Sequence, residues 1–220
     1  MKYLKGILLL SAIIYSAQLI AQDSTGLAGT PYQEVQSASG GSPYLLPDYY
    51  SGSIRMENDK VFDGVQMRYD ILKDEVEYKN ESGLFRISKG IQEFSIPSGI
   101  DLYVFRSGFP AVDSYTTNSF YRIVYDGETK LLKKYQSPIK VEKASATYEL
   151  NPDALLYILK DGKLNQVTLK DRNSFLKLLS EERNKMQYVI REENLDFAAS
   201  DDLAKLLEEF DSYKAGRGGN

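Results

Sequence analysis

The side chains able to do chemistry in this sequence are carboxylates, lysines, hydroxyls and phenols, because the chain contains neither histidine nor cysteine. Without imidazole and thiolate there is no Ser/His/Asp triad, no cysteine nucleophile, no cysteine-held iron–sulfur cluster and no zinc site of the usual type. Paired carboxylates or a Ser/Lys pair are the remaining catalytic options, and the sequence indicates no cofactor.

Three carboxylates cluster around one predicted turn: Asp70, Asp74 and Glu75. Glycoside hydrolysis needs only two carboxyl groups about 5 to 10 Å apart, so a carboxylate-dependent hydrolase is one alternative. Acidic residues at turns are ordinarily solvated, and we expect that here. The EF-hand pattern is absent, and Asp201–Asp202 fit the first turn of a helix, so no metal site is predicted.

The motifs of nucleophilic and nucleotide chemistry are weak or missing. SxxK occurs at Ser137–Lys140 and Ser174–Lys177, without the KTG and SDN elements of penicillin-recognising enzymes, and Ser174 is more simply a helix-capping residue. The patterns GxxxxGK[ST], GxGxxG and GxSxG do not occur. We therefore expect no catalytic residues.

Tyrosine is the one compositional excess, with 17 Tyr against 9 Phe and no Trp. Tyrosine combines a large apolar ring with a polar hydroxyl and is favoured on binding surfaces. The tyrosines after the leader and the aromatic residues in and beside the loop 107–120 are our candidates for ligand or partner binding: Tyr44, Tyr49, Tyr50, Phe109, Tyr115 and Tyr121. An ordinary long connection, with Tyr121 in the next strand, is the alternative.

The N-terminus has the pattern of a secretory signal. Lys2 and Lys5 precede the apolar run ILLLSAIIYSAQLI at 7–20, which is shorter than the roughly 20 residues that span a bilayer. We predict a signal peptide at 1–21 with cleavage after Ala21, an uncleaved anchor being the alternative. No membrane span is expected after cleavage. The remaining 25 basic and 31 acidic residues argue against nucleic-acid binding.

Four segments are expected in the chain. After the signal peptide, 22–43 is predicted to be a flexible leader because it is rich in Gly, Ser, Thr and Gln without periodicity. Residues 44–214 are expected to form a single β-rich domain whose end, 171–214, is helical. Residues 215–220 are expected to be a disordered tail.

Short alternating runs of Val, Ile, Tyr and Phe predict the strands. They are 53–56, 65–72, 75–79, 85–88, 91–96, 102–106, 120–125, 131–135 and 139–142, with a hairpin over 157–170 that turns at Asp161–Gly162. In the run from Val65, one face is apolar and the other, with Arg68 and Asp70, is polar.

Three helices are predicted after Asp171. Asp171 or Ser174 can cap the first and Ser180 the second, while Ser200 begins the third. The last has an apolar stripe, Leu203, Leu206, Leu207 and Phe210, which we expect to cover the sheet rather than a partner. The fold class is α+β: an antiparallel β-meander sheet or partly open barrel with two or three C-terminal helices packed on it.

Together, the signal ending in AQ, the segment GSPYLLPDYYSGSIRMENDKVFDGVQMRYDILKDEVEYK and the tail FLKLLSEERNKMQYVIREENLDFAASDDLAKLLEEFDSY resemble uncharacterised exported proteins of Bacteroidota. The resemblance covers most of the chain after the signal. It implies a location in the periplasm or at the outer-membrane periphery, with secretion as a further option, and it implies no activity.

These observations favour an exported, non-enzymatic binding or structural module whose partner is an envelope protein or a glycan. The hydrolase remains one alternative. A carrier of an apolar ligand is another, if the sheet curls around a cavity lined by Phe85, Phe94, Phe105 and Phe120. The oligomeric state stays open.

Overall fold

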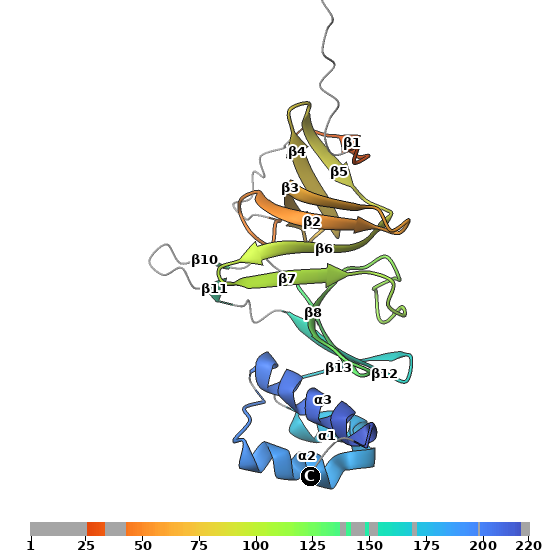
Figure 1. Ribbon diagram of the computed structural model, residues 1–220, viewed down its shortest axis with the longest axis vertical. Coiled ribbons are helices and arrows are strands. Elements are labelled where there is room, and N and C mark those ends of the chain that lie inside the picture. Colours follow the sequence, from red (N-terminus) through yellow and green to blue (C-terminus); the bar gives the residue numbers. More distant parts are fainter. Residues whose placement is uncertain are drawn as a thin grey trace, which may run out of the picture.

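The computed structural model of the protein describes residues 26–33, 43–136, 140–141, 148–149, 154–168, 171–197 and 199–216. These residues form a long antiparallel sheet with α-helices packed at its C-terminal end (Figure 1). The predicted signal peptide, Ser137 and the last four residues of the predicted tail lie outside the described residues.

The main sheet has eleven described strands in the order β1-β5-β4-β3-β2-β6-β7-β8-β9-β12-β13, and every pair is antiparallel. The strands are β1 Thr30–Pro31, β2 Tyr50–Met56, β3 Val61–Asp70, β4 Glu75–Asn80, β5 Gly83–Ile87, β6 Ile91–Ser98, β7 Asp101–Arg106, β8 Tyr121–Asp126, β9 Lys130–Lys134, β12 Leu155–Lys160 and β13 Lys163–Val167. A separate ribbon pairs β10 (Lys140–Val141) with β11 (Tyr148–Glu149). The antiparallel α+β fold is confirmed, as an open sheet with β1 and β13 at its edges.

The predicted hairpin turn between β12 and β13 is confirmed. Asp161 and Gly162 have φ angles of 51° and 72°, and Lys160 pairs with Lys163 across them. This is the left-handed conformation that a two-residue hairpin loop needs. Asp59 and Asp74, at φ 62° and 59°, similarly allow the chain to turn between β2 and β3 and between β3 and β4.

Strands β2 to β7 enclose an aromatic core. The rings of Phe94 and Phe105 stack at 4.8 Å, and Phe120 meets Phe94 edge-on at 5.0 Å. Phe85 lies outside this stack, 5.2 Å from the ring of Tyr78. These four phenylalanines therefore pack against other rings, Phe94, Phe105 and Phe120 as buried core residues and Phe85 as a partly buried neighbour of the core.

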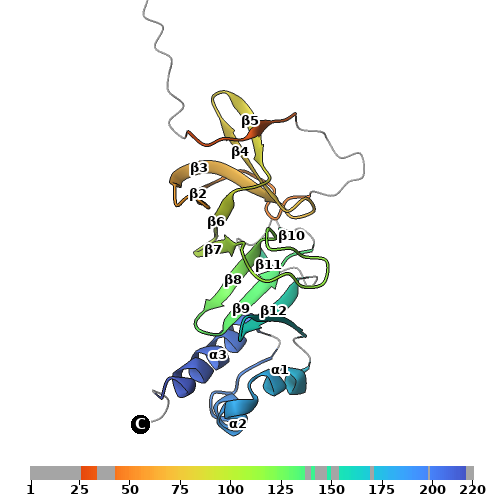
Figure 2. The same ribbon diagram turned by 90° about the vertical axis from the view of Figure 1, so that its right-hand side faces the viewer.

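The C-terminal helices cover the last strands of the sheet, at the opposite end of the molecule from β1 (Figure 2). They are α1 (Arg172–Leu178), the short 3₁₀ helix η1 (Ser180–Glu182), α2 (Arg183–Glu192) and α3 (Ser200–Lys214). The predicted apolar stripe of α3 is at most 1% exposed and packs in one cluster with Leu131 and Ile158 of the sheet. The stripe therefore covers its own sheet, as predicted. None of the described helices is long and apolar enough to cross a membrane.

Capping follows the sequence in one helix and departs from it in another. Asp171 is the N-cap of α1, and its Oδ1 accepts the backbone N–H of Ser174 at 3.0 Å. Ser180 does not cap α2, because residues 180–182 form η1 and α2 begins at Arg183.

The expected flexible leader is partly wrong. Within its described residues, Leu27 is only 5% exposed and belongs to the core, and Thr30–Pro31 form the edge strand β1. The polar face of β3 is solvated only in part, since Gln66 is exposed but Arg68 and Asp70 are 5% and 1% exposed. The chain around residues 32 and 43–49 lies beside β3, and its tyrosines cover Arg68.

Candidate peptide-binding edge

Residues 26–33 lie along the outer edge of β5 in the manner of a bound extended peptide. Thr30 and Pro31 pair with Arg86 and Phe85, and the backbone N–H of Tyr32 donates to the carbonyl of Leu84 at 3.0 Å. We call residues 26–33 the edge segment. Backbone groups of successive residues point to opposite sides of a strand, and the N–H of Tyr32 points toward β5. Position 31 therefore points away from β5, and because it is a proline it has no N–H to offer on that side. The edge segment therefore ends the sheet.

Two positions of the edge segment fix its register. Leu27 inserts its side chain into the core, and its carbonyl accepts the hydroxyl of Tyr78 at 2.7 Å. Gly29 lies directly against the same tyrosine, because a Cβ there would stand 2.8 Å from Cε1 of Tyr78 and 3.0 Å from Cβ of Phe85. Only glycine fits this approach without moving a buried ring.

A buried ionic network holds Tyr32. Glu77 is fully buried on β4 and accepts hydrogen bonds from the Tyr32 hydroxyl, from Nε of Arg68 at 3.0 Å and from Arg86. Burial raises the pKa of Glu77, but the hydrogen bonds from Arg86, Tyr32 and Arg68 outweigh it and hold the pKa below its ordinary value. Burial and the Glu77 carboxylate raise the pKa of Tyr32, so its hydroxyl stays a donor.

The structure brings Tyr44 and Tyr49, two of the predicted binding residues, to this network. The guanidinium of Arg68 stacks 3.5 Å from the ring centre of Tyr44 and 4.4 Å from that of Tyr49, and it donates to the Tyr44 hydroxyl at 2.7 Å. Tyr32 and Tyr49 hydroxyls lie 2.9 Å apart. Tyr50, the third of this group, is half-buried and packs against the core. Tyr32, Gly29 and Glu77 were not among the predicted site residues.

A hollow of about 490 Å³ lies where the edge segment meets the β4–β5 hairpin. Its walls are Pro31, Tyr32, Gln33, Ser82, Leu84 and Phe85. The strand edge, the glycine contact, the buried ionic network and this hollow occur together. Sheet edges that bind extended peptides combine main-chain hydrogen bonds with side-chain contacts of this kind.

The other predicted binding residues lie elsewhere, in a second aromatic cluster on β8, β9 and β12. Phe109 and Tyr121 are 6% and 0% exposed, and their rings meet edge-on at 5.7 Å. Tyr115 is half-buried, 6.1 Å from the ring of Tyr121. The loop 107–120 folds back on the sheet, so the prediction of an exposed recognition surface is wrong for Phe109 and Tyr121.

The acidic cluster is less solvated than we expected, since Asp70 is 1% exposed and Asp74 and Glu75 are half-buried. Asp74 is joined to the buried Lys134 at 2.7 Å and accepts a hydrogen bond from Tyr69, while Asp70 accepts the backbone N–H groups of Leu72 and Lys73. Lys134 also donates to the carbonyl of Phe120 at 3.0 Å. Each carboxylate is thus committed to a structural partner. Within the described residues, no cluster of three or more acidic side chains could hold a metal ion.

A Ser/Lys pair that the sequence did not indicate lies between the sheet and α3. Nζ of Lys133 donates to Oγ of Ser200 at 3.2 Å, and Lys133 is 5% exposed. Burial, reinforced by nearby Arg122, lowers the pKa of Lys133 to about 8. Lys133 lies in the basic run LKKY and Ser200 at the start of a helix far along the chain, so no short sequence motif contains both residues. At the weak SxxK match Ser174–Lys177, Ser174 hydrogen bonds Asp171, the N-cap of α1.

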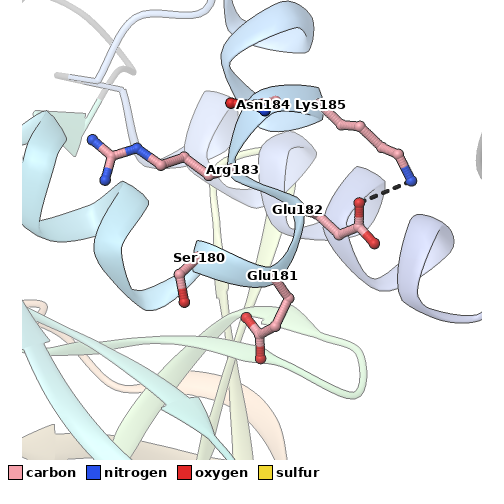
Figure 3. Close-up of a pocket in the computed structure, with 6 residues that line it drawn as sticks. All are labelled: Ser180, Glu181, Glu182, Arg183, Asn184 and Lys185. Atoms are coloured by element: carbon pink, nitrogen blue, oxygen red, sulfur yellow. Dashed lines mark ion pairs between the residues drawn. The ribbon is translucent and has the colours of Figure 1, made fainter.

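A second hollow, of about 400 Å³, lies at η1 and the start of α2 (Figure 3). Its side chains point in different directions: Arg183 and Ser180 diverge, while Glu182 turns to its ion-pair partner Lys185 at 2.8 Å. Glu181 is paired with Lys160 of β12. Because these groups do not converge on one point, this hollow is a weaker site than the edge of β5.

The sequence matches no family model, and no curated protein or solved structure is significantly similar to it.

Proposed function

We propose that the protein is an exported, non-enzymatic binding module of the periplasm or outer-membrane periphery that binds an extended polypeptide at the outer edge of β5. The observation that carries this proposal is the edge segment itself, seated there as an added strand. Export is supported by the signal pattern at 1–21 and by the resemblance to exported proteins.

The chemistry of the described side chains supports binding over catalysis. Asp70, Asp74 and Glu77 each satisfy a backbone, lysine or arginine partner. A general acid or nucleophile must instead face a substrate cleft. The edge of β5, in contrast, already holds a polypeptide segment through main-chain hydrogen bonds and side-chain contacts.

The test uses the full chain with Gly29→Val, which places an isopropyl group against Tyr78 and prevents the chain's own edge segment from seating. Binding of a fluorescent peptide of residues 26–33 is measured by anisotropy. In the unchanged chain the tethered segment competes at high effective concentration, so we expect the Gly29→Val chain to bind the peptide about tenfold more tightly. Ala28→Val is the matched control, because Ala28 is exposed and its chain should bind the peptide like the unchanged one.

A peptide carrying the same Gly29→Val change should not bind, which ties recognition to the contact with Tyr78. Circular dichroism establishes that the Gly29→Val chain keeps its β-rich fold. If the folded variant binds neither peptide, or both equally, the edge of β5 is not a peptide site and the proposal is wrong.

A further inference from the structure

We propose that the partner at this edge is a second copy of the same chain, whose edge segment takes the place of the resident one. This inference rests on the proposed function and names its partner. Each copy would donate residues 26–33 to the other and accept the same residues in return, which makes a two-fold symmetric pair.

The fit of the site to this sequence is the first argument. The site buries the apolar side chain of Leu27, leaves no room for a side chain at Gly29 and accepts a hydrogen bond from the hydroxyl of Tyr32. The pattern Leu-x-Gly-x-x-Tyr is present in every copy of the chain, so a second copy supplies a ligand that matches at each position. Residues 26–33 carry no charged side chain, so two copies meet without repulsion between the exchanged segments.

The attachment of the edge segment is the second argument. Residues 34–42 are the nine that join Gln33 to Pro43, and nine residues can span at most roughly 30 Å when extended. Exchange therefore requires the acceptor edge to lie within that distance of Pro43 of the donor chain. The paired part of the segment is only two residues long, so few backbone contacts must open for exchange.

The proline of the edge segment is the third argument. Pro31 presents no N–H on the side away from β5, so a strand seated there does not template another beyond it. A seated segment therefore stays the last strand of its sheet, so exchange does not add further strands at this edge.

The test traps the exchange with engineered cysteines, since the chain has none of its own. Thr30 and Arg86 are directly opposite in the β1–β5 register, and such antiparallel pairs lie about 5.5 Å apart at Cα, within the range of a disulfide. A Thr30→Cys chain and a differently tagged Arg86→Cys chain are refolded together and oxidised. We expect a disulfide between positions 30 and 86 of different chains, on a non-reducing gel and by peptide mass spectrometry.

Two control mixtures give the size of the effect. Adding Gly29→Val to the Thr30→Cys chain should lower the cross-linked fraction about tenfold, because that segment no longer seats. Replacing the acceptor by a Lys163→Cys chain places the cysteine on β13, at the other edge of the sheet, and should give only the collisional background.

The outcomes separate this inference from the proposed function. If the mixed chains give no more cross-link than the Lys163→Cys background, while a Thr30→Cys/Arg86→Cys chain closes its disulfide internally, the segment stays on its own molecule and the second-copy partner is overturned. Binding of the free peptide to the Gly29→Val chain is measured independently and still decides whether the edge is a peptide site.

Discussion

The two ends of the sheet are covered in different ways. At the C-terminal end, α3 buries four side chains that are at most 1% exposed, all from one apolar stripe. At the other end, the edge segment inserts Leu27, packs Gly29 against a ring and joins Tyr32 to a buried ionic network. A helix that buries a whole stripe is held by many interchangeable contacts. The eight-residue edge segment depends on a few specific contacts.

The largest effect is expected where the helical end is weakened. Phe210→Ala removes a fully buried ring from the contact between α3 and the sheet and should lower the free energy of unfolding by about 4 kcal/mol. Denaturant titration measures the loss. Hydrogen exchange should show it in α1 to α3, with β3 to β5 remaining protected. Equal loss of protection at both ends would mean that they form one cooperative unit and would remove the contrast between them.

The next effect is expected at the end covered by the edge segment. Glu77→Gln removes the carboxylate that pairs with the buried Arg68 and accepts a hydrogen bond from the Tyr32 hydroxyl. The substitution should lower the free energy of unfolding by about 3 kcal/mol. The control is Glu75→Gln, two residues earlier on β4, which changes a half-buried pair with Arg86 and should cost less than about 1 kcal/mol. Comparable losses from the two substitutions would show that the buried network does not hold this end.

The smallest effect is expected between the two ends, at neighbouring lysines on opposite faces of β9. Lys134 has Asp74, Tyr69 and the Phe120 carbonyl as partners, whereas the described contact of Lys133 is Ser200. Because the pKa of Lys133 falls to about 8 from 10.5, the unfolded chain binds more protons between these values, and stability should rise with pH. From pH 7 to 9.5 the gain from Lys133 is about 1 to 2 kcal/mol.

Unfolding by urea at several pH values measures this gain. Lys133→Met should flatten the rise, while Lys163→Met on the exposed end of β13 should leave it unchanged. A slope that is the same in all three chains would show that the folded protein does not hold Lys133 with a lowered pKa.

Much of the fold was predictable because it follows from local patterns. Alternating apolar residues predicted a strand at 65–72, which overlaps β3 at Val61–Asp70. Asp161–Gly162 located the last hairpin, and the spacing of Leu203, Leu206, Leu207 and Phe210 located α3. In each case the signal is contained in a few neighbouring residues and repeats with the period of the element. The same period also determines which face of each element is buried.

The candidate site was only partly predictable. Tyr44 and Tyr49 both contact Arg68, but a tyrosine excess does not say which tyrosines meet, and Phe109 and Tyr121 proved to be core. Tyr32, Gly29 and Glu77 were missed because the contacts that join the edge segment to β4, Tyr32 with Glu77 and Gly29 with Tyr78, link positions 45 or more residues apart. The composition of 22–43 predicted flexibility, and nothing local marks a two-residue strand within it.

The sequence by itself determined most of the strands, turns and helices, with the exceptions of β1 and η1, because hydrophobic period, positive-φ turn residues and helix caps act over a few positions. The tertiary structure alone decided that residues 26–33 close the sheet, that Arg68 and Glu77 are buried beneath tyrosines, and that Lys133 meets Ser200. These contacts depend on the order of strands in the sheet, which places residues far apart in the chain side by side, and local physical preferences do not encode that order.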